Sequence, residues 1–302
     1  MDGISDMYDA SKGHSISGLN SNLVFGLIFV AVIIAAFCIA FFVPVGSKES
    51  KGLADMKLTS ANNVLLAELN DPHTREFFVT LAELDPDAAL DLEIDAERAI
   101  EDGADEDELV MMLFNATDPS DLQDLSKANA KHFDAILRHT RSGLDSMSRG
   151  RSKWCKGSTY ERFADMSQYQ VMREVEKTFG YGSEAYEWGI QLNTLVLKAR
   201  VDGQRNPVQN GKLTPQDEAV MQNSMMKLIT NPQVMKLMMA SGQNTQQQKA
   251  AVRNVDFCNL GGSALGIVMS LPNGTRQRLW GEMGSQLNDA KFKRALSQMG
   301  GF

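Results

Sequence analysis

The stretch LVFGLIFVAVIIAAFCIAFFV, residues 23–43, decides the architecture expected for this chain. It has 21 residues and no charge. A helix of that length, rising about 1.5 Å per residue, matches the roughly 30 Å hydrocarbon core of a bilayer. Pro44 and Gly46 follow the run, where the chain can leave the helix outside the lipid. The sequence therefore predicts one transmembrane helix over residues 23–43, with the lipid bilayer as its partner.

A cleaved signal peptide is the alternative for this segment. Signal peptides carry a positively charged start, an apolar region of about 7–15 residues and a small-residue cleavage site. Here the apolar run is longer and ends in bulky residues, and Asp2, Asp6 and Asp9 outnumber the single Lys12 before it. These features favour an uncleaved anchor, preceded by a flexible polar tail over residues 1–22.

The rest of the chain is expected to be water-soluble. Residues 44–57 read as a linker, and the remainder is long enough to bury a core without a covalent staple. A Gly- and Ser-bearing basic stretch near position 150 divides it into two predicted regions, an acidic-then-basic one over 58–150 and a second over 151–302. We expect helices in both.

Short polar residues followed by proline mark the predicted helix starts. The polar side chain caps free backbone N–H groups, and proline occupies the first helical position, where its missing N–H is harmless. The five such pairs are Asp71-Pro72, Asp85-Pro86, Asp118-Pro119, Thr214-Pro215 and Asn231-Pro232. Thr214 and Asp217 also have the spacing of a capping box, although Glu or Gln is preferred at the fourth position.

The apolar residues between these starts repeat with helical spacing, and no alternating strand pattern appears. A long helix is expected from Pro119 to about Met147, and another over 245–270 that Gly261-Gly262 could bend or break. The remaining predicted helices cover 86–102, 108–115, 159–178, 184–201, 215–229, 232–240, 274–287 and 289–298. The predicted fold class is therefore all-α: one N-terminal transmembrane helix followed by a multi-helix soluble domain.

The soluble part contains two cysteines, Cys155 and Cys258. In a translocated domain an isolated pair indicates one disulfide. The alternative is two buried free thiols, since Cys is among the most buried residue types. A zinc site is not expected, because the sequence has no CxxC and neither cysteine has a nearby His.

The side of the membrane is indicated by two opposing signals. Lys48, Lys51 and Lys57 after the run outnumber Lys12 before it, which favours a cytoplasmic domain by a small margin. A disulfide between the soluble cysteines would instead place the domain outside the cytoplasm. We follow the disulfide and expect an extracytoplasmic domain of a single-pass, signal-anchored membrane protein.

Charge is segregated along the chain. From Glu83 to Asp124 there are sixteen acidic residues and one basic residue, and from Lys127 to Lys156 there are eight basic and two acidic residues. Such blocks indicate solvated helix faces, or faces that pair within the fold or with protein partners. The net charge of −8 argues against a dedicated nucleic-acid binder, whose affinity depends on neutralising phosphates.

Histidines and carboxylates are the candidate catalytic groups in this sequence. His132 and His139 lie seven residues apart on one predicted helix, farther than the i, i+4 spacing of helical metal ligands. The acidic cluster around Gly103 does not have the register of a calcium loop. A glycan hydrolase would need two carboxylates at a defined separation, for which Glu161, Glu174 and Glu187 are arbitrary candidates. We therefore assign no catalytic, metal or cofactor residue.

The basic stretch with a central tryptophan could touch an anionic lipid surface, or it could be a solvated loop that pairs with the acidic block. It consists of Arg149, Arg151, Lys153, Trp154 and Lys156. Taken together, the sequence favours a membrane-anchored, non-enzymatic helical interaction or structural protein of the cell envelope. The alternatives are an envelope hydrolase with a carboxylate-based site, of the glycan type, and a membrane-tethered adaptor that faces the cytoplasm.

Overall fold

The computed structural model describes residues 64–116, 124–163, 180–240 and 245–287, together with residues 166, 167, 170, 173, 174 and 177. The predicted tail, the predicted transmembrane helix over 23–43 and the linker lie outside these residues. None of the helices within the described ranges is both long and apolar enough to cross a membrane. The predicted all-α class holds for the described residues, in which the β structure is one isolated bridge between Lys156 and Asp256.

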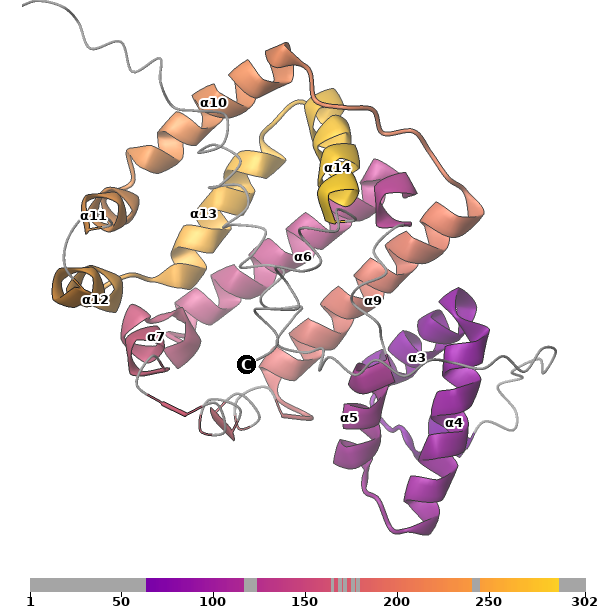
Figure 1. Ribbon diagram of the computed structural model, residues 1–302. Helices are drawn as coiled ribbons and strands as arrows, with labels where there is room; N and C mark the ends of the chain where they lie inside the picture. The colour runs from indigo at the N-terminus through magenta and orange to yellow at the C-terminus, as the bar shows by residue number, and fades with distance from the viewer. Residues whose placement is uncertain are drawn as a thin grey trace, which may run out of the picture.

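The described elements are α-helices and two short 3₁₀ helices (Figure 1). The first are α2 (Val64–Glu68), α3 (Pro72–Leu84), α4 (Pro86–Glu101), α5 (Glu106–Ala116), η1 (Leu125–Lys127) and α6 (Ala130–Arg149). They are followed by η2 (Lys153–Cys155), α7 (Gly157–Phe163), α9 (Glu184–Arg205), α10 (Pro215–Ile229) and α11 (Pro232–Ala240). The last are α12 (Thr245–Arg253), α13 (Phe257–Met269) and α14 (Asn273–Leu287).

The predicted caps are in place at the described helix starts. Side chains accept hydrogen bonds from backbone N–H groups two or three residues farther on at Asp71, Asp85, Thr214 and Asn231. Thr214 and Asp217 form the reciprocal capping box, so an aspartate serves where Glu or Gln is preferred. The Asp118-Pro119 pair lies outside the described residues. These local bonds explain why α10 and α11 begin where the sequence predicts.

Two predicted long helices are wrong in their extent. The structure divides 245–270 into α12 and α13 at Asn254–Asp256, where the Asp256 side chain caps α13 by accepting from the N–H of Asn259. Gly261 and Gly262 lie inside α13 and do not break it. The helix predicted to begin at Pro119 begins at Ala130 instead, because Asn129 is the cap of α6. In both cases a short polar cap without proline sets the boundary.

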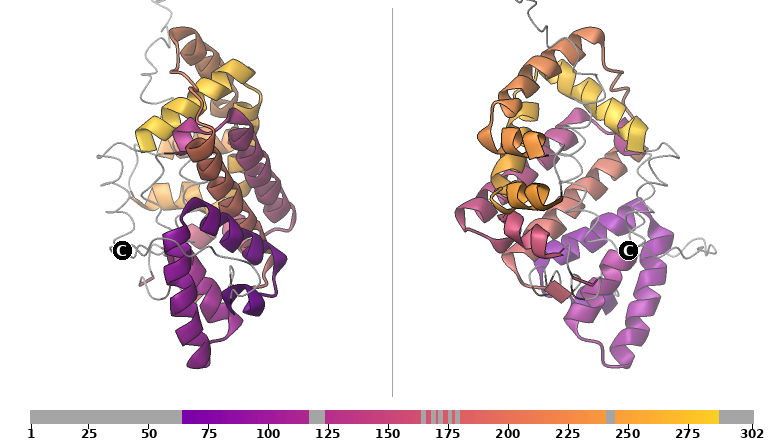
Figure 2. Two further views of the ribbon diagram at one scale, coloured as in Figure 1. Left: turned by 90° about the vertical axis from the view of Figure 1, so that its right-hand side faces the viewer. Right: turned by 60° about the vertical axis from the view of Figure 1, so that its left-hand side comes forward.

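Helices α13, α6, α9 and α3 form a row of packed helices through the molecule. Helix α13 packs on α6, α6 packs on α9, and α9 packs on α3, so these segments lie side by side although they are distant in sequence (Figure 1). Both views of Figure 2 place α3–α5 at one end, with α10–α14 toward the other. We call α2–α5 the N-terminal region, and α6, α7 and α10–α14 the C-terminal region. Helix α9 belongs to both.

The N-terminal region has its own apolar core. The buried side chains come from α2, α3, α4 and α5, and α9 completes the core. Phe77 and Phe78 are each 1% exposed at its centre. The contributing residues of α9 are Tyr186, Ile190 and Leu197.

A second core fills the C-terminal region. Its buried members extend from Leu125 to Trp280 and include Cys155 and Cys258. Phe133 of α6 stacks on Trp280 of α14 with ring centroids 4.6 Å apart. Helices on both sides of position 150 supply this one core, so the structure groups 125–149 with the later helices and not with the acidic segment before it.

Helices α6 and α9 cross closely at a glycine. A Cβ atom at Gly143 would lie 2.0 Å from Nε1 of Trp188, a distance that real Cβ atoms do not reach. At this crossing Trp188 Nε1 donates to the carbonyl of His139 at 3.3 Å, and His139 Nε2 lies 3.0 Å from the carbonyl of Trp188. Gly143 therefore allows the two helices to exchange polar contacts through their side chains.

Helix α14 is held by two guanidinium groups. Arg278 binds the buried carboxylate of Asp217 in α10 with two bonds of 2.7 and 2.6 Å. Arg276 binds Asp134 of α6 in the same bidentate manner and also donates to the carbonyls of Met269 and Leu271. Arg276 thereby satisfies the Met269 carbonyl, which the end of α13 leaves without a helical partner, and the Leu271 carbonyl just beyond the helix.

Candidate functional site: a disulfide junction and an exposed methionine surface

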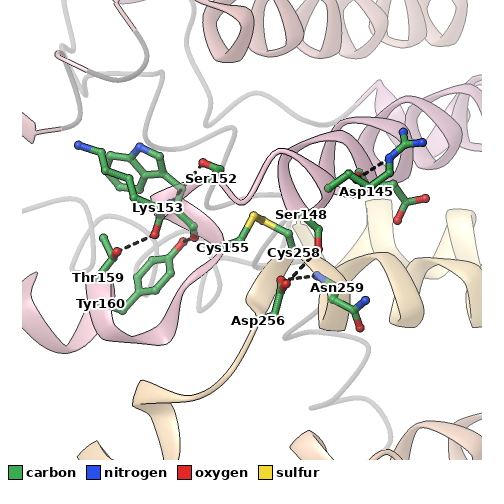
Figure 3. The surroundings of a disulfide bond; sticks show 12 residues. Asp145, Ser148, Ser152, Lys153, Cys155, Thr159, Tyr160, Asp256, Cys258 and Asn259 are labelled. Carbon is green, nitrogen blue, oxygen red and sulfur yellow. Dashed lines mark hydrogen bonds between the residues drawn. A yellow bond between two sulfur atoms is a disulfide. The ribbon is translucent and has the colours of Figure 1, made fainter.

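A disulfide bond joins Cys155 to Cys258, which are 103 residues apart in sequence (Figure 3). Cys155 ends η2, and Cys258 lies in the first turn of α13. Both side chains are buried within the C-terminal core. The pair is the one that the sequence predicts, and free thiols are the alternative that the structure does not adopt.

Polar contacts around the disulfide fix the two segments that carry it. Asp256 accepts from the Ser148 hydroxyl at 2.9 Å, so the α13 cap is also tied to the end of α6 (Figure 3). The N–H of Gly157 donates to the carbonyl of Val255 at 2.8 Å, beside the bridge between Lys156 and Asp256. The junction thus joins α6, η2, α7 and α13 within a few residues of one covalent bond.

A metal site at the same place is not supported. Cys155, Asp256 and Cys258 each place one potential ligand atom within 4.8 Å of the others. Metal binding requires thiolates, however, and both sulfur atoms are used in the disulfide. The Asp256 carboxylate accepts from Ser148 and Asn259 instead. The geometry is that of a covalent staple.

The two helical histidines are not brought together. His132 Nε2 lies 3.4 Å from a carboxylate oxygen of Asp202, near the end of α9. Burial lowers the pKa of His132 and outweighs the opposing effect of Asp202. His139 contacts Trp188 at the crossing of α6 and α9. Each histidine therefore has a separate structural partner.

The acidic cluster around Gly103 is a helix stop followed by a helix start, as predicted. Helix α4 ends at Glu101, and Gly103 adopts a φ of 93°, which glycine reaches without a steric penalty. Asp105 then accepts from the N–H of Glu108 and so caps the first turn of α5. Within this cluster Asp105 is a helix cap, and Glu106 accepts hydrogen bonds from Asn70 and Tyr181.

Glu106 ties α5 to the start of α3. It accepts from the backbone N–H of Asn70 at 2.6 Å, from the Asn70 side chain at 3.1 Å and from the hydroxyl of Tyr181. Burial alone would raise the pKa of Glu106, but the hydrogen bonds from Tyr181 and Asn70 lower it. Burial and the adjacent Glu106 carboxylate raise the pKa of Tyr181. The carboxylate therefore stays ionised as an acceptor.

The three carboxylates named as candidates for a hydrolase do not lie in surroundings typical of a catalytic acid. Glu161 accepts two 2.7 Å bonds from Arg253, and this pairing lowers its pKa. Glu174 accepts from Lys153 at 3.0 Å, which likewise lowers its pKa. Glu187 is exposed. A general acid needs a raised pKa, so the pairings of Glu161 and Glu174 favour structural roles.

The basic stretch is partly engaged within the fold. Lys153 binds Glu174 and also lies over the Trp154 ring, 5.6 Å from its centroid. Arg149 donates to the carbonyl of Asp145 one turn earlier. Arg151 and Lys156 are exposed. The Trp154 side chain is buried, so it does not form the aromatic part of a lipid contact.

An exposed apolar surface on α10 and α11 was not anticipated from the sequence. Met226 is 42% exposed, and in α11 Met235, Met238 and Met239 are 48%, 42% and 69% exposed. The three methionines of α11 have i, i+3, i+4 spacing, so they share one face of the helix. Lys227 and Lys236 are also exposed on these helices. We call these six residues the methionine surface.

One indication of this surface was present in the sequence, namely its high frequency of methionine. Methionine fills helical cores as well as adaptable binding surfaces. The buried Met221 and Met225 of α10 illustrate the first use, whereas the four methionines of the methionine surface are exposed. Composition could not separate the two uses because it does not tell which face of a helix is buried.

Comparison with known proteins gives no functional assignment: no protein-family model matches the sequence, and neither a curated protein nor a solved structure matches it.

Proposed function

We propose that this chain is a membrane-anchored, non-enzymatic helical protein of the cell envelope that presents its soluble domain for interaction outside the cytoplasm. The anchor would be the uncharged run over residues 23–43. The domain would be the disulfide-stapled helical assembly that follows it. Proteins bound by this domain are expected partners.

The disulfide between Cys155 and Cys258 is the observation that carries this proposal. Disulfides form and persist in oxidising compartments and are rare in the cytosol, where thiols are kept reduced. Both sulfur atoms are buried in the core, so the bond is part of the fold and not an exposed redox pair. This supports an extracytoplasmic domain over a cytoplasm-facing adaptor.

The pairing of charged groups supports an interaction role over catalysis. Asp217, Glu106, Glu161 and Glu174 are each bound by cationic or neutral donors that lower their pKa values. Catalytic carboxylates that donate protons are held in environments that raise the pKa. These four therefore act as stabilising acceptors, and the hydrolase alternative gains no support from them.

The proposal is tested by reporter cysteines in the full chain expressed in cells, with Cys38→Ala as background. Glu97→Cys places a thiol on the exposed surface of α4, and Ser17→Cys places one before the anchor. A membrane-impermeant maleimide should label Glu97→Cys in intact cells and Ser17→Cys only after lysis. Alkylation after acid trapping and denaturation should find Cys155 and Cys258 protected until a reductant is added.

The opposite pattern would reject the proposal. Labelling of Ser17→Cys in intact cells, with Glu97→Cys labelled only after lysis and with reduced Cys155 and Cys258, would identify a cytoplasm-facing protein. Labelling of both reporters without lysis would show that residues 23–43 do not span the bilayer. A Lys57→Cys reporter just after the anchor should behave like Glu97→Cys.

A further inference from the structure

The methionine surface lies in a segment with an unusual charge composition. Residues 219–255 contain no aspartate or glutamate, whereas they contain four basic residues and six methionines. The whole chain has a net charge of −8. The segment is therefore a cationic, apolar part of an acidic protein.

Its exposed residues combine apolar and cationic groups on adjacent helices. Met235, Met238 and Met239 form one face of α11, and Lys236 lies beside Met235 in the same turn. Met226 and Lys227 make the equivalent pair in the last turn of α10, which packs on α11. Long lysine stems can keep their ammonium groups in the headgroup layer while neighbouring apolar side chains enter it.

The acidic residues of the protein are gathered elsewhere. The segment from Glu83 to Asp124 has sixteen acidic residues and belongs mainly to α4 and α5. These helices lie at the end of the molecule away from α10 and α11 (Figures 1 and 2). An anionic surface would repel the N-terminal region and attract the methionine surface, which gives the domain one preferred orientation.

The proposed anchor keeps the domain close to such a surface. Residues 44–63, twenty in all, separate the apolar run from α2. Fully extended they reach at most about 70 Å, at roughly 3.3–3.6 Å per residue. A tether of this length holds the domain at an effective concentration on the order of millimolar. Weak contacts suffice for docking at that concentration.

From these observations we infer that the methionine surface of α10 and α11 docks on the headgroup layer of the bilayer that holds the anchor, with a preference for anionic lipid. The four methionines enter the boundary between headgroups and acyl chains, and Lys227 and Lys236 pair with lipid phosphates. This inference rests on the proposed function through the anchor over residues 23–43. In this arrangement the domain lies against the membrane surface and is not connected to it by the tether alone.

The test uses the full chain reconstituted in vesicles, with an environment-sensitive NBD fluorophore at Met238→Cys in the Cys38→Ala background. One set of vesicles is phosphatidylcholine alone, and in the other about a third of the lipid is phosphatidylglycerol. A label at Glu97→Cys is the matched control on the acidic end. We expect the label at position 238 to emit at shorter wavelength and to be quenched by lipid-borne nitroxide in the anionic vesicles only. The label at position 97 should not respond.

Charge neutralisation then tests the role of the lysines. Because each lysine near an anionic surface contributes about fivefold, Lys227→Gln with Lys236→Gln should lower the ratio of docked to free domain about 30-fold. The matched double variant Lys156→Gln with Lys212→Gln removes the same charge at other exposed positions and should change the ratio less than about twofold. All four sites are exposed, so the variants keep the fold.

Three results would overturn the inference. No change in NBD emission in either vesicle would show that the surface does not dock. Equal changes in NBD emission in neutral and anionic vesicles would show that docking does not depend on anionic lipid. A change that grows with the ratio of protein to lipid would identify a second copy of the chain as the occupant.

Failure of the anchor is measured separately by flotation and alkaline extraction of the same vesicles. A chain that floats but shows no emission change retains the proposed anchor and loses only the docking. A chain that does not float lacks the anchor, and the emission of position 238 after addition to preformed anionic vesicles still tests whether the surface binds lipid.

Discussion

Different kinds of interaction stabilise the N-terminal region and the C-terminal region. In the N-terminal region, apolar side chains of α2–α5 and of α9 form the core, and caps such as Asp71 and Asp85 act within three residues. In the C-terminal region, a disulfide and two arginine clamps join segments separated by 61 to 142 residues. The C-terminal region thus adds long-range bonds to its local caps, and the same residue can serve both, since Asp217 and Asp256 each take part in a helix cap and also bind a side chain of another helix.

Helix α9 is the element through which the two regions meet. Tyr186, Ile190 and Leu197 are buried in the first core, and Ala199 is buried in the second. On the surface, Lys198 and Arg205 of α9 pair with Glu76 and Glu83 of α3. These exposed pairs contribute little energy, so the cores themselves decide how strongly the regions are coupled.

The largest expected effect comes from removing the disulfide. Cys155→Ser with Cys258→Ser should lower the free energy of unfolding of the C-terminal region by about 4–5 kcal/mol, since a closed loop of about 100 residues is valued near 4.7 kcal/mol by the chain-entropy model. Region-resolved hydrogen exchange on the full chain measures the loss. Amides of α6 and α13 should lose protection, and those of α3 and α4 should change little. Cys38→Ser is the control.

Equal losses of protection in both regions would mean that α9 couples them into one cooperative unit. The two regions would then differ in their bonds but would unfold together. Unchanged protection in α6 and α13 would show that the core around Phe133 and Trp280 suffices without the covalent bond.

A core truncation in the N-terminal region should have the next largest effect. Phe77→Ala removes a side chain that is 1% exposed, and such a change costs about 3–4 kcal/mol through lost burial and the cavity left behind. The protection of α3–α5 should fall, while the disulfide-linked helices keep theirs. Val79→Ala in the same helix is the matched control, because Val79 is 44% exposed. A comparable loss of protection in Val79→Ala would mean that Val79 belongs to the core, which would contradict the structure.

The Asp217 clamp should give a smaller and pH-dependent effect. Its carboxylate accepts bonds from Arg278, Thr214 and Thr275, and the Arg278 guanidinium holds the pKa of Asp217 well below its usual range. Asp217→Asn leaves Arg278 without a charged partner, and because that arginine is about a third exposed, we expect a loss of about 2–3 kcal/mol.

The sign of the pH dependence follows from the lowered pKa. The unfolded chain protonates this aspartate near a pKa of about 3.9, above the folded value, so the stabilisation is complete above about pH 5 and is lost as the pH falls toward the folded pKa. Thermal unfolding from pH 7 to pH 3 should show a steeper acid decline for the native chain than for Asp217→Asn. Glu218→Gln, next to it and partly exposed, is the control. Parallel declines would contradict the assignment.

Sequence predicted the parts of this fold that depend on neighbouring residues. The Thr214-Pro215 and Asn231-Pro232 pairs place the starts of α10 and α11, because capping requires only two or three residues of context. The pairing of Cys155 with Cys258 could also be anticipated, since the third cysteine, Cys38, lies within the predicted transmembrane run. The break at Asp256 was missed because it lacks proline.

The close helix contacts were less accessible to prediction. Gly143 reads as an ordinary helical glycine until Trp188, 45 positions later, is placed against it. Gly262, at which the sequence indicated a possible bend or break, is a second such contact, where an added Cβ would lie 2.7 Å from a carboxylate oxygen of Asp145. The residue that contacts each glycine lies on another helix. Which residue that is depends on tertiary packing, and a glycine in the sequence does not reveal it.

The smallest expected effect concerns a single helix cap in the N-terminal region. Asp85 accepts from the N–H of Ala88 at 3.0 Å and ends α3 as well as beginning α4. Asp85→Ala should cost about 1 kcal/mol, the usual value of such a cap, and Asp85→Asn should retain most of it because asparagine caps equally well. Asp91→Ala at an exposed mid-helix site is the control. Because the lost bond is local, the change should appear as faster exchange in the first turn of α4 with the disulfide-linked helices unaffected. If protection of α6 or α13 fell as well, the N-terminal region would have to support the C-terminal one through α9, and local capping could not be separated from tertiary packing in this protein.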